Sequence, residues 1–150
     1  MDNKTYTTLP NELINTEGLK LDHVIVYLMC KSHMNIKTRQ CYPSIATLAK
    51  KCKIGRVQIT TYLQDLEDTG YIKILHAERK GQVNHYEFPT EKEEKFEMIS
   101  TALLNNPNLT AKEKTYLAIL QKYFIIDKDS RTGKYRLSTR EISEITKTPI

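Results

Sequence analysis

Two short helical patterns followed by two alternating patterns, between Tyr42 and Phe88, constrain the fold of this chain more than any other feature. Pro43 presets the backbone and Ser44 is a suitable N-cap, so we expect the first helix to begin here. The apolar positions of this helix share one face: Ile45, Leu48, Ala49 and Cys52. Gly55 then interrupts the pattern and suits a tight turn between two helices.

The second helical pattern begins at Arg56 and ends before Gly70, a residue type suited to the position just after a helix. Its buried side is expected to be Ile59, Leu63 and Leu66, with Tyr62 beside them. Two alternating segments, 71–75 and 83–88, flank a turn at Gly81 and predict a β-hairpin. Two helices around a short turn, followed by a hairpin, predict a helix-turn-helix with a wing.

The chain before Tyr42 predicts one further helix. Residues 20–32 carry apolar side chains at helical spacing, which indicates an amphipathic helix. Its buried face is expected to be Leu21, Val24, Ile25, Leu28 and Met29. The preceding LPNELIN segment predicts a short helical turn that begins at Pro10, and residues 34–42 predict an irregular loop.

The chain after the hairpin changes composition. A charged stretch over 91–106 spaces Phe96, Ile99 and Leu103 three and four residues apart, so we expect a linker helix there. The fold class predicted from these patterns is mainly α with a small β-hairpin wing, that is, α+β.

Two capping-box pairs mark the starts of later helices: Thr110 with Glu113, and Ser138 with Glu141. The helix that begins at Thr110 is expected to bury Tyr116, Leu117, Leu120 and Phe124. A turn-rich loop follows over 127–135.

The two halves of the chain are similar in outline, which suggests a tandem repeat whose second copy is cut short. We therefore expect a winged helix-turn-helix DNA-binding domain over 1–89, a helical linker over 90–108, and a partial second helix-turn-helix-like module over 109–150. An oligomerisation segment is the alternative for 109–150.

Residues 9–89 resemble the winged helix-turn-helix family of phage and plasmid replication proteins and regulators from Gram-positive bacteria. The residues that carry the resemblance are Tyr42-Pro43-Ser44, Leu48-Ala49, Ile54, Ile59, Leu63, Leu66 and Gly70-Tyr71-Ile72. The resemblance implies DNA binding and no particular biological process. Gly55 departs from the family, which often has Ser there, because Gly offers no hydroxyl to a phosphate.

The second helix predicts a surface that reads bases. If its apolar side faces inward, the opposite side is free of carboxylates and carries Arg56, Val57, Gln58, Thr60, Thr61 and Gln64. Arg suits guanine, Gln suits adenine, and a Thr or Val methyl suits thymine in the major groove of DNA. The chain has no acid between Asp22 and Asp65, although its net charge is only +5.

The same acid-free window supplies candidates for phosphate contacts. Lys50, Lys51 and Lys53 lie on and after the first short helix, and Ser44 lies at its start. Lys37 and Arg39 lie in the preceding loop. The turn of the wing adds Arg79, Lys80 and Gln82.

Catalytic and cofactor sites find no support in the sequence. The four histidines share no metal-ligand spacing, and the motifs of phosphate-binding loops and hydrolase nucleophiles are absent. Cys30 and Cys52 lie on apolar helix faces and are expected to be core thiols. No apolar run reaches the length of a membrane span. We expect no enzyme activity, no cofactor or metal, and a cytoplasmic protein associated with the nucleoid or a plasmid.

The favoured function is a sequence-specific double-stranded DNA-binding protein that regulates transcription, as a homodimer. Two alternatives stay open: a plasmid or phage replication initiator that binds origin repeats, and a winged helix that docks proteins during primosome assembly.

Overall fold

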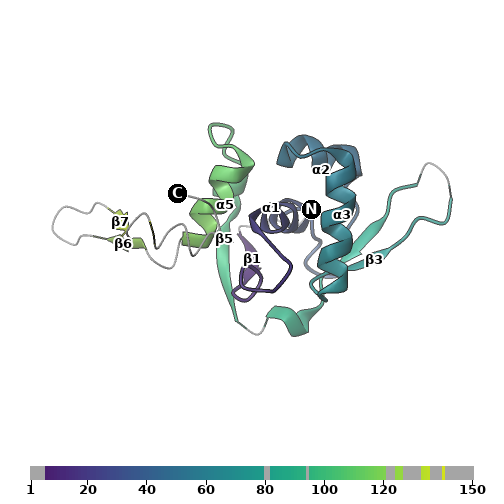
Figure 1. The fold of residues 1–150 in the computed structure, drawn as a ribbon, viewed down its shortest axis with the longest axis horizontal. Coiled ribbons are helices and arrows are strands. Elements are labelled where there is room, and N and C mark those ends of the chain that lie inside the picture. Colours follow the sequence, from purple (N-terminus) through teal and green to yellow (C-terminus); the bar gives the residue numbers. More distant parts are fainter. Residues whose placement is uncertain are drawn as a thin grey trace.

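A central helix, α1 (Leu21–Lys31), organises the fold, and all of its residues except Asp22 are buried (Figure 1). The computed structural model describes residues 6–79, 82–93, 95–120, 124–126, 133–135 and 140. Three helices pack against α1: α2 (Ile45–Cys52), α3 (Arg56–Asp68) and α5 (Ala111–Leu120). The predicted helix over 20–32 is confirmed, but it is buried on every side because α5 covers a part that α2 and α3 leave open.

The predicted pair of short helices is confirmed in α2 and α3. Ser44 caps α2, and its hydroxyl accepts the Thr47 N–H at 3.0 Å. The tight turn differs from the expectation, because the left-handed residue is Lys53, with φ of 56°. Gly55 is instead the extended N-cap of α3. Gly70 has φ of 87° just after α3, as expected for a glycine that ends a helix.

The wing is confirmed as an antiparallel pair, β3 (Lys73–Leu75) and β4 (His85–Glu87). A third short strand, β2 (Gln40–Cys41), pairs with β4, so the sheet order is β2-β4-β3. This strand lies in the segment predicted to be an irregular loop. A strand of two residues leaves no periodic signal in the sequence, and it forms because β4 offers an edge.

The linker helix predicted over 91–106 is wrong. That segment contains a 3-10 turn, η1 (Thr90–Glu93), a strand, β5 (Phe96–Ser100), and a single helical turn, α4 (Thr101–Leu104). β5 pairs antiparallel with β1 (Tyr6–Pro10), with Thr7 opposite Ile99. The apolar residues of β5 fit helical spacing equally well, and the distant partner strand decides the outcome. Pro10 is therefore the last residue of β1, and the turn predicted for this segment follows it over 11–15.

The capping box of α5 is confirmed. Thr110 N–H donates to Glu113 Oε1 at 3.0 Å, and Glu113 N–H donates to Thr110 Oγ1 at 3.1 Å. The predicted buried set is wrong in part, because Leu117 is 37% exposed and Tyr116 only partly buried. The residues buried on α5 are Ala111, Thr115, Ala118, Ile119 and Leu120. These residues form the side of α5 that packs toward the core.

The predicted helix also extends too far, because Phe124 belongs to a strand. β6 (Phe124–Ile126) and β7 (Gly133–Tyr135) form a separate antiparallel pair, in the segment predicted to be partly loop. The capping pair of Ser138 and Glu141 lies outside the described residues, and the second helix-turn-helix-like module stays a prediction.

One core joins both sides of the predicted boundary near residue 90. Buried residues from Leu9 on β1 to Ile119 on α5 form a single cluster. The wing and the β6–β7 pair project at opposite ends of the molecule (Figure 1). The core therefore holds α2 and α3 on a body that includes α5.

Candidate nucleic-acid interface

The outward face of α3 carries all six residues that the sequence proposes for base reading, and all six are exposed. Val57 is 81% exposed, although valine is among the residue types most often buried in folded proteins. The inward face buries Ile59, Tyr62, Leu63 and Leu66, as predicted. The helix thus separates an apolar side from a polar side that has no carboxylate over 56–64.

Two threonines of this face are oriented by the helix itself. Thr60 Oγ1 donates to the Arg56 carbonyl, and Thr61 Oγ1 donates to the Val57 carbonyl, both at 3.1 Å. Their hydrogens are used within the helix, so each hydroxyl oxygen is left to act as an acceptor. These threonines therefore present acceptors and methyl groups to a ligand.

Gln64 is in a different environment from the other five residues. Its amide nitrogen donates to Glu67 Oε1 at 3.2 Å and to Asp68 Oδ1 at 3.0 Å. Glu67 also accepts the Ile74 N–H at 2.7 Å, which connects the end of α3 to the wing. Gln64 thus marks the place where the carboxylate-free face of α3 ends.

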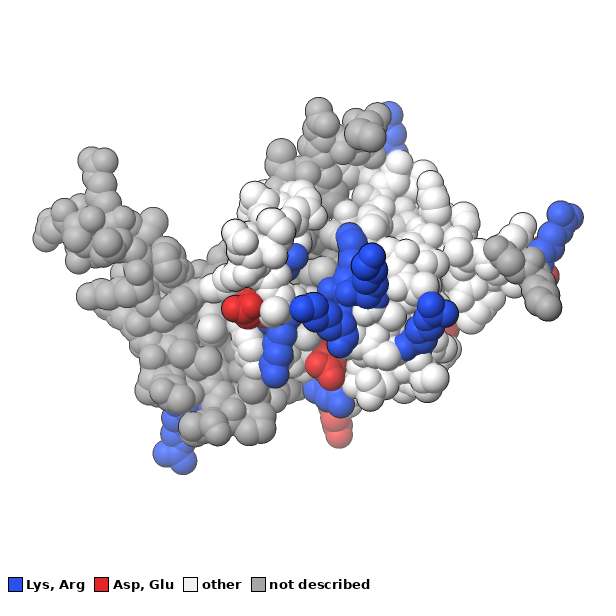
Figure 2. Space-filling model, turned by 90° about the horizontal axis from the view of Figure 1, so that it is seen from above, with Lys and Arg blue, Asp and Glu red and all other residues white. Residues whose placement is uncertain are grey.

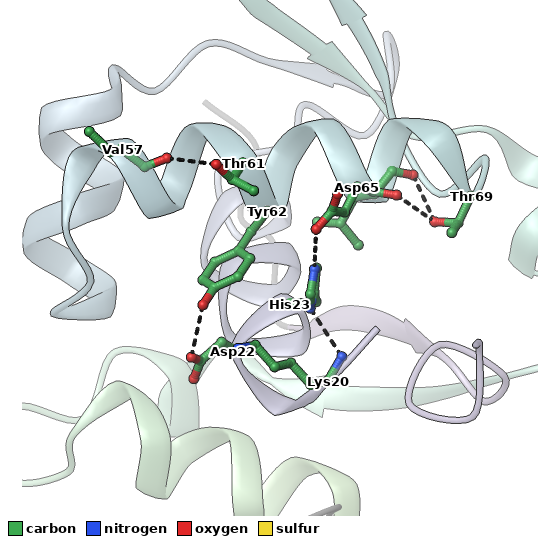
Figure 3. A network of polar contacts seen from close by, with 9 residues as sticks. Lys20, Asp22, His23, Val57, Thr61, Tyr62, Asp65 and Thr69 are labelled. Atoms are coloured by element: carbon green, nitrogen blue, oxygen red, sulfur yellow. Dashed lines mark hydrogen bonds and ion pairs between the residues drawn. The ribbon is translucent and has the colours of Figure 1, made fainter. Parts of the chain in front are cut away.

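The buried side of α3 is fixed to α1 by polar contacts (Figure 3). His23 Nε2 lies 2.8 Å from Asp65 Oδ2. The Tyr62 hydroxyl donates to Asp22 Oδ2 at 3.3 Å, and the rings of His23 and Tyr62 lie 4.6 Å apart between centroids. These contacts set the rotation of α3 about its axis, and hence the direction of its outward face.

The three lysines predicted to bind phosphates from the α2 side, Lys50, Lys51 and Lys53, are all exposed. Lys51 Nζ donates to His33 Nε2 at 3.0 Å. Partial desolvation of its ammonium group, with a smaller contribution from the charge of Lys114, lowers the pKa of Lys51 although most of the side chain is exposed. Ser44 is partly buried and its hydroxyl is occupied in capping α2, so it supplies a phosphate contact less readily than the sequence suggests.

The two loop candidates for phosphate contacts, Lys37 and Arg39, lie in different environments. Lys37 is exposed in a turn whose backbone is held by Asn35 Oδ1. Arg39 has φ of 58°, and its Nε donates to the Phe88 carbonyl at 2.8 Å. Arg39 also lines a cavity of about 320 Å³ beside β1 and β5. The Arg39 side chain therefore binds the backbone just after β4, at the end of the wing sheet.

The wing retains two exposed polar candidates, Arg79 and Gln82. The Gln82 N–H donates to the Arg79 carbonyl at 3.2 Å and forms the described part of the turn. Lys80 lies outside the described residues. The base of the wing is joined to the segment before α2 by a stack of Tyr42 on His85, with 5.3 Å between ring centroids.

Tyr42, Thr47 and Lys114 are surface residues near this interface that the sequence did not identify as site candidates. Tyr42 is 66% exposed despite its stack on His85. Thr47 is exposed in the first turn of α2, and Lys114 lies one turn into α5. Only Tyr42 had a signal, in the Tyr42-Pro43-Ser44 motif, whereas Lys114 is brought here only by the packing of α5.

Basic side chains gather on the end of the molecule where α2, the start of α3 and the loop before α5 meet (Figure 2). Few carboxylates appear on that view of the surface. Such a surface attracts polyanions over a range set by the salt concentration.

Two further features are absent from the part of the chain that the structure describes. Within that part, no cluster of three or more His, Cys, Asp or Glu side chains is arranged to hold a metal ion. No helix of that part is both long and apolar enough to span a membrane.

Comparison with known proteins gives one positive result. Residues 17–72 match the family of helix-turn-helix domains. Neither the curated proteins nor the solved structures contain a match to the chain. The matched range includes α1, α2 and α3 and ends before the wing. The match supports a helix-turn-helix domain over residues 17–72, and a domain of this type suggests DNA binding.

Proposed function

We propose that this protein binds double-stranded DNA sequence-specifically, with α3 in the major groove, and that it regulates transcription rather than catalysing a reaction. The single observation that carries the proposal is the exposed, carboxylate-free face of α3 over 56–64. A helix that enters the major groove needs such a face, because carboxylates are repelled by the phosphates on both sides.

The side chains of this face match the chemistry of base edges. Arg56 suits the two acceptors of guanine, and Gln58 suits the donor and acceptor of adenine. Val57 is the natural contact for a thymine methyl group, which accounts for an aliphatic side chain that is 81% exposed. The contacts of His23 and Tyr62 beneath α3 keep these side chains in one register.

Two copies of the chain would bind two half-sites, as helix-turn-helix dimers do. The outward side of the β1–β5 sheet supports association, because Tyr6, Phe96 and Met98 are 44%, 44% and 51% exposed there. Exposed apolar groups on a sheet are typical of interaction surfaces. Sedimentation of the protein alone and on a selected duplex tests for the dimer.

The first experiment is a binding titration of the full chain on random and selected duplexes at several salt concentrations. With about six phosphate contacts, the affinity is expected to fall about a thousandfold between 50 and 200 mM salt. Weak binding without salt dependence would contradict the proposal and favour a protein-docking role.

Two variants test the base-reading part and the phosphate-binding part of the interface separately. Arg56→Ala is expected to relax sequence preference, whereas Lys51→Ala is expected to weaken binding to every duplex alike. Footprinting on the source DNA then tests the biological role. A protected site over a promoter supports regulation, and an array of direct repeats at an origin contradicts it in favour of initiation.

A further inference from the structure

A groove with four lysines lies between α2 and the start of α5. It is a cavity of about 810 Å³ lined by Lys50, Lys51, Lys53 and Lys114, together with polar groups that include Thr47 and Asn108. No carboxylate is among its lining residues. Three of the lysines belong to the helix-turn-helix region, but Lys114 belongs to α5, outside the matched range 17–72.

The four lysines line one groove, so their positive charges are gathered around the same space. Partial desolvation lowers the pKa of Lys51, and the positive charge of Lys114 contributes a smaller part of that lowering, as repulsion between two ammonium groups does. Glu113 is near Lys53, but its carboxylate accepts the Thr110 N–H at 3.0 Å and so serves the cap of α5. Among the described residues, none of the four lysines forms an ion pair with a carboxylate. A bound anion would relieve the repulsion.

The groove continues the proposed base-reading surface. Lys53 ends α2, and only Ile54 and Gly55 separate it from the first residue of α3. Figure 1 shows α2, the start of α3 and the loop before α5 at the same end of the molecule, and Figure 2 shows basic side chains gathered there. A polymer of phosphates that passes α3 therefore meets the groove next.

We propose that the groove between α2 and α5 holds the sugar–phosphate backbone of the DNA that α3 reads, and that Lys114 makes a phosphate contact from outside the helix-turn-helix domain. This inference rests on the proposed DNA-binding function. It assigns part of the segment after residue 90 to the DNA interface, where it lengthens the protected site on one side.

The chemistry of the groove favours a phosphate backbone over other ligands. Its charged groups are all lysines, which act as point charges on phosphates and do not read bases. No aromatic side chain lines it, so it offers no platform for an unpaired base. An acidic protein segment would satisfy the charges, but it would not account for continuity with the carboxylate-free face of α3.

The test compares Lys114→Gln with Lys112→Gln in the full chain. Lys112 is an exposed lysine of α5 that does not line the groove, and its Nζ lies 5.9 Å from the Tyr116 ring centroid. We expect Lys114→Gln to weaken binding to selected and scrambled duplexes alike, and to reduce the slope of log affinity against log salt by about 0.9. Lys112→Gln should match the unmodified protein, and Lys114→Arg should retain most of the affinity.

Duplex length supplies a second measurement. Shortening the selected duplex on the side of α2 should abolish the difference between Lys114→Gln and the unmodified protein. Equal affinity and equal salt slope for both glutamine variants on a long duplex would overturn this inference and leave the proposed function standing. Failure of the unmodified protein to bind any duplex would instead overturn the proposed function, and the inference with it.

Discussion

His23 on α1 and Asp65 on α3 are joined by a hydrogen bond of 2.8 Å between Nε2 and Oδ2. His23 Nδ1 accepts the Lys20 N–H at 3.0 Å, so Nε2 carries the ring hydrogen and donates it to Asp65. The ring is thus oriented at both ends (Figure 3). Because Asp65 lies beside the buried residues of α3, this bond helps to fix which face of α3 points outward.

Removal of the imidazole should destabilise the fold. His23 is only 2% exposed, so His23→Ala deletes a buried hydrogen bond and the ring contact with Tyr62. We expect the free energy of unfolding to fall by about 1–3 kcal/mol. Urea denaturation measures the change, with the exposed His76→Ala as the control, which should stay within about 0.5 kcal/mol. Equal stability of the two variants would show that this contact contributes nothing.

The β1–β5 pair makes adjacent residues of β5 respond in opposite ways. Ile99 is fully buried and lies opposite Thr7, whereas Met98 is 51% exposed. Ile99→Ala should cost about 2–5 kcal/mol of unfolding free energy, because it leaves a cavity in the core. Met98→Ala should cost less than about 0.5 kcal/mol. The helix predicted over 91–106 would bury Phe96 together with Ile99, whereas β5 leaves Phe96 44% exposed. A loss for Phe96→Ala as large as that for Ile99→Ala would therefore contradict the strand.

The elements predicted correctly are those whose signals are local. Ser44 caps α2 through its own side chain, Gly70 takes the positive φ that ends α3, and Thr110 and Glu113 cap α5 reciprocally. The exposed face of α3 followed from the positions of its apolar residues alone. These features depend on residues within a few positions of one another, which is why the sequence reveals them.

The elements missed depend on partners far away in the chain. Phe96–Ser100 becomes a strand because residues 6–10 pair with it across roughly ninety residues. Arg39 appeared to be a free loop cation, but the Phe88 carbonyl holds its Nε. Lys114 joins the basic groove only because α5 packs on α1 and α2. Periodicity along the chain contains no information about such neighbours.

The capping box of α5 predicts a pH-dependent contribution to stability. The hydrogen bonds from Thr110 lower the pKa of Glu113, so the folded state favours the carboxylate. Its contribution should be present above the ordinary value of 4.5 and should be lost as the pH falls below it. The difference in melting temperature between the unmodified protein and Glu113→Gln should therefore shrink from pH 6 to pH 3. A constant difference would contradict this role.

Substitution of Thr110 tests the contribution of its hydroxyl to the same cap. Thr110→Ala should cost about 0.5–2 kcal/mol, whereas Thr110→Ser keeps the acceptor and should cost little. Urea denaturation distinguishes them. If both substitutions cost the same, the side-chain cap does not stabilise α5.

The thiols should be unreactive while the protein is folded. All three cysteines are buried and free, and burial raises the pKa of Cys52 from 9.0 to about 12. Its thiolate fraction at pH 8 is then lower by about a thousandfold. A thiol reagent should label Cys52 slowly in buffer and rapidly in urea. Rapid labelling of the folded protein would contradict the burial of this helix face.

The raised pKa of Cys52 also predicts how the stability of the fold changes at alkaline pH. The unfolded chain loses the Cys52 proton near pH 9.0, whereas the folded protein retains it up to about pH 12. The stabilising contribution of the buried thiol is therefore present below pH 9.0 and falls as the pH rises above it. Urea denaturation of Cys52→Ala should show a weaker decline between pH 8 and pH 10 than the unmodified protein.

The most direct test of the base-reading role of α3 is selection from a random duplex pool with the unmodified protein and with Arg56→Ala, at one fixed salt concentration. The account predicts one enriched sequence for the unmodified protein. It predicts that Arg56→Ala loses preference at one or two adjacent base pairs, by about 1–3 kcal/mol per pair, and keeps the rest. Enrichment of the same sequence with the same affinity by both proteins would contradict the account.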